Sequence, residues 1–149
     1  MNTKLIDTLN KGLHLEKCDV ILPWNTLFDD LIKFGQSRLV KHSDQRSDIV
    51  WTNEIILNGL ETNLTVMRWT GIFGTNRKLK SAFGLISQID FERFIDLLDS
   101  EFGQTRKYKK INELECKYIW YLENVKVILS QRDRFGTYYQ IDLKYRKWF

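Results

Sequence analysis

A five-residue sequence occurs twice in this chain, and the segments before its two copies are alike. The stretch FGQSR at residues 34–38 recurs as FGQTR at residues 102–106. Before each copy, apolar residues recur at the i, i+3, i+4, i+7 spacing of an amphipathic helix. They are Trp24, Leu27, Phe28 and Leu31 before the first copy, and Phe91, Phe94, Ile95 and Leu98 before the second. We therefore predict two helices that end on the same Phe-Gly signal, where Gly35 and Gly103 suit a left-handed stop.

The starts of these helices are also marked. Pro23 suits the first turn of the first helix, and Asp90 can accept hydrogen bonds from the free N–H groups at the start of the second. If the duplication is structural, Phe34 and Phe102 should be buried at equivalent places. A further short helix is expected over residues 1–11.

Strand-like segments follow each helix in a similar order. After the first helix we expect a polar loop at 41–47, strands at 48–51 and 54–57, a hairpin turn at 58–59, and strands at 60–69 and 78–87. After the second we expect a basic loop at 107–110, strands at 116–122, 125–129 and 137–145, and turns at 123–124 and 134–136. These patterns predict an α+β protein with two similar helix-plus-antiparallel-strand repeats. Repeat one spans about 12–87 and repeat two about 88–149, packed as a single domain over residues 1–149.

Positive charge is concentrated in the second half. The formal net charge is +4 over 149 residues, and residues 103–149 hold 11 Lys and Arg against 5 Asp and Glu. Such a field attracts acidic surfaces or phosphate backbones. No stretch approaches the roughly 20 apolar residues of a membrane helix, and the charged N-terminal segment is unlike a signal peptide, so we expect a cytoplasmic protein. Cys18 and Cys116 are too few for a disulfide framework, and we expect both in the core.

Signals of an enzyme are weak. The chain has no G-x-S-x-G, P-loop, G-x-G-x-x-G or H-E-x-x-H motif. Asp133 with the DLK sequence at 142–144, and the ECK sequence at 115–117, resemble the acids and lysine with which metal nucleases hold Mg²⁺ and the attacked phosphate. Neighbouring positions on the wet face of a strand explain the same pattern. We therefore expect no catalytic residue, metal site or cofactor, and a Mg²⁺-dependent nuclease is only the third option.

Two binding functions remain. Basic residues of the last third are interleaved with aromatic ones, as single-stranded nucleic acid needs for phosphate contacts and base stacking. The basic set is Arg106, Lys107, Lys109, Lys110, Arg132, Arg134, Lys144, Arg146 and Lys147, and the aromatic set is Tyr108, Tyr118, Tyr138, Tyr145 and Trp148. No recognisable nucleic-acid motif accompanies them. Trp, Tyr and Arg also anchor protein interfaces, and the chain has 5 Trp and 6 Tyr.

The repeat unit resembles those of small bacterial inhibitor and immunity proteins. The shared features are an aromatic-led helix ending in Phe-Gly, a polar loop, and a Trp-bearing strand with a hairpin, as in residues 119–125. The resemblance covers residues 20–145, and its members include β-lactamase-inhibitor-like tandem α+β repeats and proteins that neutralise polymorphic toxins. It implies a non-catalytic protein that docks onto a partner. The charge departs from this family, because immunity proteins against nucleases are usually acidic and this chain is basic. An acidic or neutral toxin, or a different partner altogether, would be required.

The leading hypothesis is therefore a cytoplasmic protein-binding module of the immunity-protein kind. Nucleic-acid binding by the basic last third is the alternative. The partner, a cognate toxin or enzyme, would contact basic and aromatic side chains of the second repeat. The predicted contact residues are Arg106, Lys109, Tyr118, Arg132, Arg134, Tyr138 and Lys144.

Overall fold

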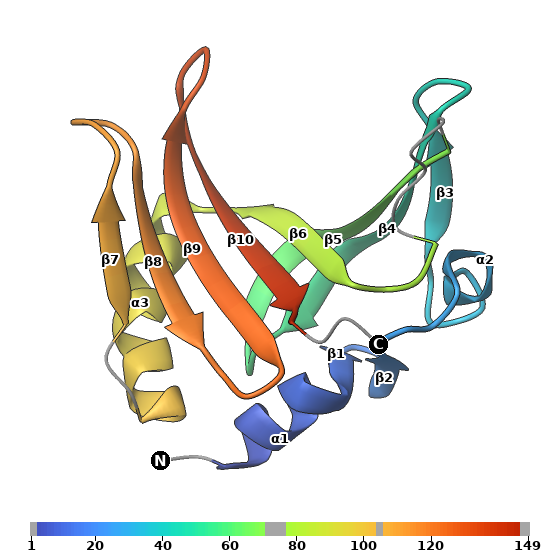
Figure 1. Cartoon of the computed structure of the whole chain (residues 1–149), viewed down its shortest axis with the longest axis horizontal. Coiled ribbons are helices and arrows are strands. Elements are labelled where there is room, and N and C mark those ends of the chain that lie inside the picture. The colour runs from blue at the N-terminus through green and yellow to red at the C-terminus, as the bar shows by residue number, and fades with distance from the viewer. Residues whose placement is uncertain (1–2, 71–76, 104–105, 147–149) are drawn as a thin grey trace.

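The computed structural model describes residues 3–70, 77–103 and 106–146 as an α+β protein (Figure 1). Its helices are α1 (Thr3–Lys11), α2 (Phe28–Leu31) and α3 (Gln88–Phe102). Its strands are β1 (Gly12–Leu15), β2 (Val20–Pro23), β3 (Arg38–Lys41), β4 (Arg46–Ile56), β5 (Leu60–Trp69), β6 (Ser81–Ile86), β7 (Lys107–Lys110), β8 (Cys116–Tyr121), β9 (Val125–Asp133) and β10 (Thr137–Tyr145). The predicted class, α+β with antiparallel strands, is confirmed. No helix in these ranges is long and apolar enough to span a membrane.

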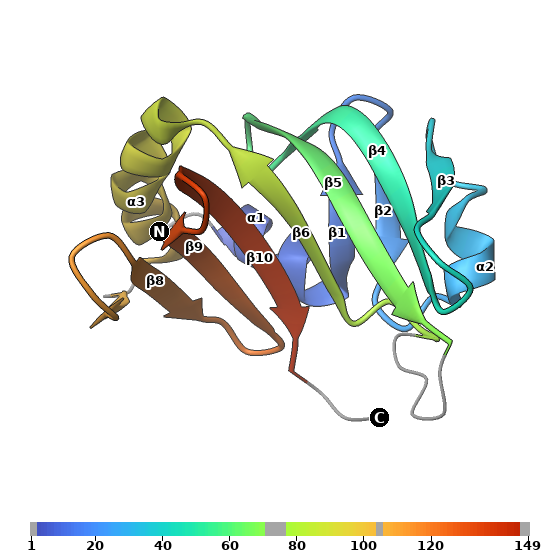
Figure 2. The same cartoon turned by 90° about the horizontal axis from the view of Figure 1, so that it is seen from above.

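Eight of the strands form one antiparallel sheet, and β1 and β2 pair in a small separate hairpin. The order in the large sheet is β3-β4-β5-β6-β10-β9-β8-β7. Each half is a meander of consecutive strands, and the halves meet where β6 pairs with β10. The sheet is strongly bent, so that its two ends rise on either side of β6 in Figure 1. In Figure 2, seen from above, α1 and the β1–β2 hairpin lie behind the sheet.

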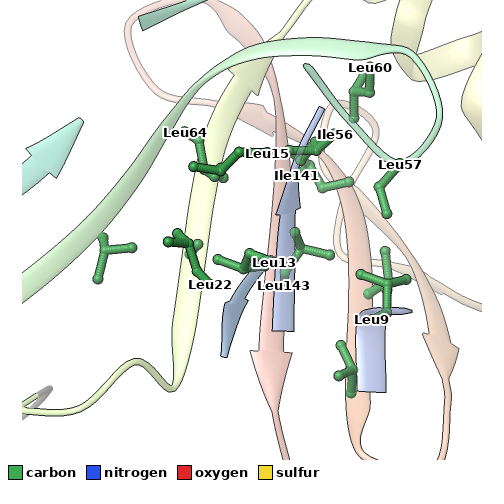
Figure 3. Close-up of a cluster of buried hydrophobic side chains, with 14 of the residues drawn as sticks. Leu9, Leu13, Leu15, Leu22, Ile56, Leu57, Leu60, Leu64, Ile141 and Leu143 are labelled. Carbon is green, nitrogen blue, oxygen red and sulfur yellow. The ribbon is translucent and has the colours of Figure 1, made fainter. Parts of the chain in front are cut away.

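The hydrophobic core lies between one face of this sheet and the helices. On β10, Ile141 and Leu143 are fully buried on one side of the strand, as the alternation of the sequence predicts. They lie in one buried cluster with Leu9 of α1 (Figure 3). Farther along the same face, the Phe91 ring of α3 lies 4.9 Å from that of Tyr139. We call this side of the sheet the covered face.

Helix α3 agrees well with the prediction. Its apolar stripe is buried apart from Ile95, which is half-buried. Gly103 ends the helix in the left-handed conformation, with φ at 61°. The N-cap is Ser87, whose hydroxyl accepts a hydrogen bond from the Asp90 backbone N–H. Asp90 therefore lies in the first turn and does not itself cap the helix, since the serine three residues before it takes that place.

The first predicted helix is much shorter than expected. Only Phe28–Leu31 is helical, because Pro23 is taken up by the β1–β2 hairpin as the last residue of β2. Trp24 therefore lies outside the helix and is not part of its predicted apolar stripe. Its indole N–H donates to the Leu9 carbonyl oxygen at 2.7 Å. Gly35 has the predicted left-handed φ of 61°, but it lies in the turn between α2 and β3 rather than directly after a helix.

Most strands lie where the sequence places them. The strands at 60–69 and 137–145 have the predicted bounds, and the segments at 48–51 and 54–57 join into β4 with a bulge between them. The basic segment 107–110 is the edge strand β7, so its prediction as a loop is wrong. The β1–β2 hairpin lies where no strand is predicted. Strands β1, β2 and β7 each have four residues, and the conformation of such short strands depends on a pairing partner more than on their own sequence.

The repeated Phe-Gly segments both lie beside a buried tryptophan. Phe102 is buried, and its ring meets that of Trp120 on β8 edge-on, with centroids 6.3 Å apart. Phe34 is half-buried, so the prediction of full burial is wrong there. Its carbonyl oxygen accepts a hydrogen bond from the indole of Trp51 on β4 at 2.8 Å. Residues 104–105 of the second copy lie outside the described residues.

The two cysteines have different surroundings. Cys18 is exposed, so its prediction as a core residue is wrong. Cys116 is half-buried against the core, and this burial raises the pKa of its thiol. A raised pKa keeps the thiol protonated and weakly reactive, which agrees with a packing role for Cys116.

Candidate functional site: the open face of the sheet

The second face of the eight-stranded sheet has no helix packed on it in the described part of the chain (Figures 1 and 2). Residues paired across neighbouring strands share a face, so the register shows which side chains belong to it. One row crosses all eight strands: Lys107, Ile119, Ile128, Asp142, Phe83, Thr65, Val50 and Arg38. We call this side the open face; it consists of this row and the side chains that alternate with the covered face along each strand.

The β7–β10 part of the open face is strongly basic. Six basic side chains lie on it, against the single carboxylate of Asp142 at these strand positions. They are Lys107, Lys109, Lys117, Lys126, Arg132 and Lys144. Lys109 stands directly opposite Lys117, and Lys126 directly opposite Lys144. Because like charges in such positions destabilise a sheet, this arrangement lowers the stability of the isolated protein.

Asp142 lies at the centre of this basic surface. Both of its carboxylate oxygens accept hydrogen bonds from the Gln140 side-chain amide at 3.1 Å. Burial raises the pKa of the Asp142 carboxyl above its usual range. The hydrogen bond from Gln140 and the charges of Lys144, Arg132 and Lys117 act in the opposite direction and are the smaller effects. Three cations from three strands therefore act on one carboxylate at the middle of the sheet.

Replacing Asp142 with asparagine is expected to stabilise the protein at neutral pH. Burial penalises the charged carboxylate in the folded state, so the free energy of unfolding falls as the pH rises from the ordinary value of 3.8 through the raised pKa. Asp142→Asn removes this loss, and its advantage should vanish below pH 3.8, where the acid is protonated in both states. Urea unfolding of both proteins across the acidic and neutral range measures this difference. An Asp142→Asn variant that is less stable than the wild type at neutral pH would contradict the assignment.

The β3–β6 part of the open face is more apolar. Trp69 on β5 is 40% exposed and Leu85 on β6 is 59% exposed, while Phe83 is half-buried. Asp48 on β4 is buried, and the Arg46 guanidinium donates to it at 3.3 Å, so this carboxylate is balanced locally. The open face thus offers an apolar surface beside a basic one.

No known protein family, curated protein or solved structure matches the chain. What the open face can bind therefore has to be inferred from its own side chains.

Four of the seven predicted contact residues come together on the open face. They are Lys109, Arg132, Tyr138 and Lys144. Arg132 stands directly opposite Tyr138, and its Nε lies 3.5 Å from the hydroxyl of the fully buried Ser130. Lys144 lies on the same strand face as Tyr138, near the other end of β10.

The other three predicted residues lie elsewhere. Arg106 forms an ion pair with Asp99 of α3, and its guanidinium lies over the Tyr118 ring at 5.2 Å from the centroid. Tyr118 points to the covered face, where its ring meets the edge of Phe91. Arg134 lies in the β9–β10 turn. Arg106 and Tyr118 therefore help to attach α3 to the sheet, and a partner on the open face would not reach them.

The acids of the nuclease hypothesis do not meet. Asp142 is opposite Ile128, whereas Asp133 is opposite Thr137 at the far end of β9. The five-residue separation along β9 corresponds to about 17 Å, and the two carboxylates belong to opposite faces of the sheet. They cannot share a metal ion. The described residues contain no group of three His, Cys, Asp or Glu side chains placed to hold one.

Lys117 and Lys126 are parts of the open face that the predicted contact set lacks. Both belong to strands whose alternation is clear: Lys117 is two residues before the apolar Ile119, and Lys126 two before Ile128. Alternation alone places them on one face of each strand. It does not show that this face is the uncovered one, because that depends on where α3 and α1 pack.

A cavity of about 460 Å³ lies away from the open face, next to α1 and the β1–β2 hairpin. Three of its polar side chains, those of His14, Glu16 and Asp19, are paired with neighbours. His14 lies 2.7 Å from Asp19, and the Glu16 carboxylate accepts a hydrogen bond from the Asn58 backbone N–H at 2.6 Å. These pairs brace the hairpin, so we place the candidate site on the open face instead.

Proposed function

We propose that this protein is a non-catalytic binding module whose open face takes up an acidic surface of another protein. The observation that carries this proposal is the pair of like-charged contacts, Lys109 with Lys117 and Lys126 with Lys144, on a face without a covering helix in the described part of the chain. Such pairs cost stability in the isolated chain. Carboxylates of a partner placed between the lysines would turn this repulsion into attraction and would also speed the encounter.

An exposed apolar side chain beside the basic surface favours a protein partner over nucleic acid. Base stacking needs exposed rings beside the basic residues. Of the predicted aromatic residues, Tyr118 and Tyr145 pack on the covered face, against α3 and Trp24, and Tyr138 is half-buried on the open face opposite Arg132. Leu85 is 59% exposed and stands opposite Gln140 of β10, and such an apolar side chain suits the centre of a protein interface better than a phosphate backbone.

The order of the elements supports two similar repeats within one domain. Helix α2 precedes the meander β3–β6, and α3 precedes the meander β7–β10. Trp51 on β4 and Trp120 on β8 are both buried beside a Phe-Gly segment. Together with the resemblance to tandem-repeat inhibitors, this supports an immunity protein, whose partner would be a cognate bacterial toxin met in the cytoplasm.

Reversing the charge of Lys126 and Lys144 together is expected to abolish partner binding. The double variant Lys126→Glu, Lys144→Glu would place acidic side chains against the partner's carboxylates, and we expect affinity to fall by about 100-fold or more. The matched control is Lys11→Glu, Lys33→Glu, which changes the net charge equally at exposed positions off the open face. The measurement is a native pull-down with tagged wild type and both variants, followed by titration of the recovered partner.

Nuclease treatment of the same pull-down separates the two binding classes. A stoichiometric protein that survives treatment, binds the control variant and is lost from the open-face variant would support the proposal. Nucleic acid that disappears on treatment, with affinity falling steeply as salt rises, would favour the alternative. Equal binding by both variants would show that the open face is not the contact surface.

A further inference from the structure

Phe135 is fully exposed, at 108% of its reference surface, and no other large apolar side chain of the described residues is so exposed. It lies at the tip of the β9–β10 hairpin, in the loop of residues 134–136 between the paired residues Asp133 and Thr137. This loop projects beyond the neighbouring strands in Figure 1. An aromatic ring held wholly in water forgoes the free energy that its burial would provide.

The backbone at Phe135 is also unusual. Its φ is 56°, in the left-handed region that side chains of L residues disfavour. Among the other described non-glycine residues with positive φ, four are Asp or Asn, whose short polar side chains tolerate this region. The remaining one, Leu57, is buried in the core, so its packing offsets the strain. Neither explanation applies to Phe135.

A second hairpin loop of the chain has similar φ values at its last two positions, although its first residue, Leu57, is left-handed and Arg134 is not. The loop at residues 57–59 also has three residues and joins β4 to β5. There Asn58 has φ at 60° and Gly59 at 122°, against 56° for Phe135 and 117° for Gly136. Asn-Gly is the usual sequence for such backbone angles. The fold therefore accepts asparagine in this conformation, and the stability of the folded chain does not explain why residue 135 is a phenylalanine.

The charges around the ring are mostly positive. Arg134 precedes it in the loop, and Arg132 stands opposite Tyr138 at the nearest position of the open face, while Asp133 is the carboxylate of this hairpin end. An apolar pocket that received the ring would thus meet arginines at its border. Carboxylates are the complementary groups for such a border.

We propose that Phe135 is a hot-spot anchor that enters an apolar pocket, bordered by carboxylates, on the partner protein. This proposal rests on the proposed binding function and adds the residue on which the affinity depends most. A few aromatic and arginine side chains carry most of the binding energy of protein interfaces. The short hairpin loop restricts the backbone at residue 135 before contact, which lowers the entropy lost on binding.

The first test separates binding from folding. Phe135→Asn places at this left-handed position a residue that tolerates it and gives the turn an Asn-Gly sequence, so the Tm of the variant should stay unchanged or rise. The affinity for the partner, recovered by the wild-type protein and then purified, should fall by about 30-fold or more. The control is Ile89→Asn, which removes another exposed apolar side chain, 77% exposed at the start of α3, and should leave the affinity unchanged. A lowered Tm for Phe135→Asn, or unchanged affinity, would overturn the anchor.

The second test captures the partner directly inside the cell. A photo-reactive phenylalanine analogue placed at residue 135 in the source cells should form a discrete adduct with one protein, and the adduct should be missing when the analogue stands at residue 89. Mass spectrometry should place the cross-link in an apolar segment flanked by Asp or Glu. Adducts with nucleic acid, Phe135-dependent binding to vesicles of phosphatidylserine and phosphatidylcholine, or no adduct at all would overturn the proposal. If the pull-down still depends on Lys126 and Lys144 in those cases, the binding function stands and only the anchor fails.

Discussion

Replacing Trp120 with alanine is expected to lower the free energy of unfolding by about 3–5 kcal/mol. The Trp120 side chain is fully buried on β8, edge-on to Phe102 at the end of α3. Its indole N–H also donates to the Asp99 carboxylate at 2.8 Å, and the other oxygen of that carboxylate receives the Arg106 guanidinium. The alanine variant therefore leaves a cavity and removes one partner of the carboxylate that attaches α3 to the sheet. Chemical denaturation measures the loss.

The same substitution at Trp69 is the matched control. Trp69 is on the open face and 40% exposed, so Trp69→Ala should cost less than about 1 kcal/mol. Trp120→Phe separates the two contributions of the buried indole, since it keeps most of the ring contact but loses the N–H that donates to a carboxylate, at about 1.5–3 kcal/mol. A larger loss for Trp69→Ala than for Trp120→Ala would mean that the covered and open faces have been assigned the wrong way round.

The parts of the fold that could be predicted are those whose own sequence pattern is strong. The buried stripe of α3 has helical spacing and ends at Gly103, and β10 alternates over its whole length, so both are found correctly. The segment at 24–31 has the same helical spacing, but it follows Pro23, which is the last residue of β2 and pairs with Gly12 of β1. Pairing with the adjacent strand of a hairpin decided the conformation there, as it did for the basic edge strand β7.

The candidate site could be predicted in part for the same reason. Arg132, Tyr138 and Lys144 belong to long strands, and the alternation of β9 and β10 places them on one face. Arg106 and Tyr118 belong to the same basic and aromatic sets of the last third, yet α3 packs against the side of the sheet on which they lie. Composition identifies basic and aromatic residues, but only the packing of the helices decides which of them meet a partner. To predict the like-charge lysine pairs, one must know the register between neighbouring strands, and the sequence does not show that register directly.

The proposed function depends on both halves of the sheet forming one surface, and the seam beside β6 is where this is tested. On one side β6 pairs with β10 along its whole length, from Ser81 to Ile86. On the other side its ladder with β5 contains the single pair of Phe83 with Thr65. The Thr62 hydroxyl of β5 reinforces this short ladder by donating to the Leu85 carbonyl oxygen of β6 at 2.7 Å.

Gly84→Ala is therefore expected to destabilise the protein by about 2–3 kcal/mol, because overpacking and a lost hydrogen bond coincide. A Cβ at residue 84 would lie 2.1 Å from the Thr62 Oγ1, and the β-branched Thr62 side chain is buried and has few other rotamers. Thr62→Ala alone should cost about 1 kcal/mol for the hydrogen bond. The double variant removes the clashing hydroxyl, so its loss should stay close to that of Thr62→Ala and well below the sum of the two. Strict additivity in this cycle would show that β5 and β6 are not in contact at Gly84, and Trp69 of β5 would then have to be treated apart from the basic part of the open face.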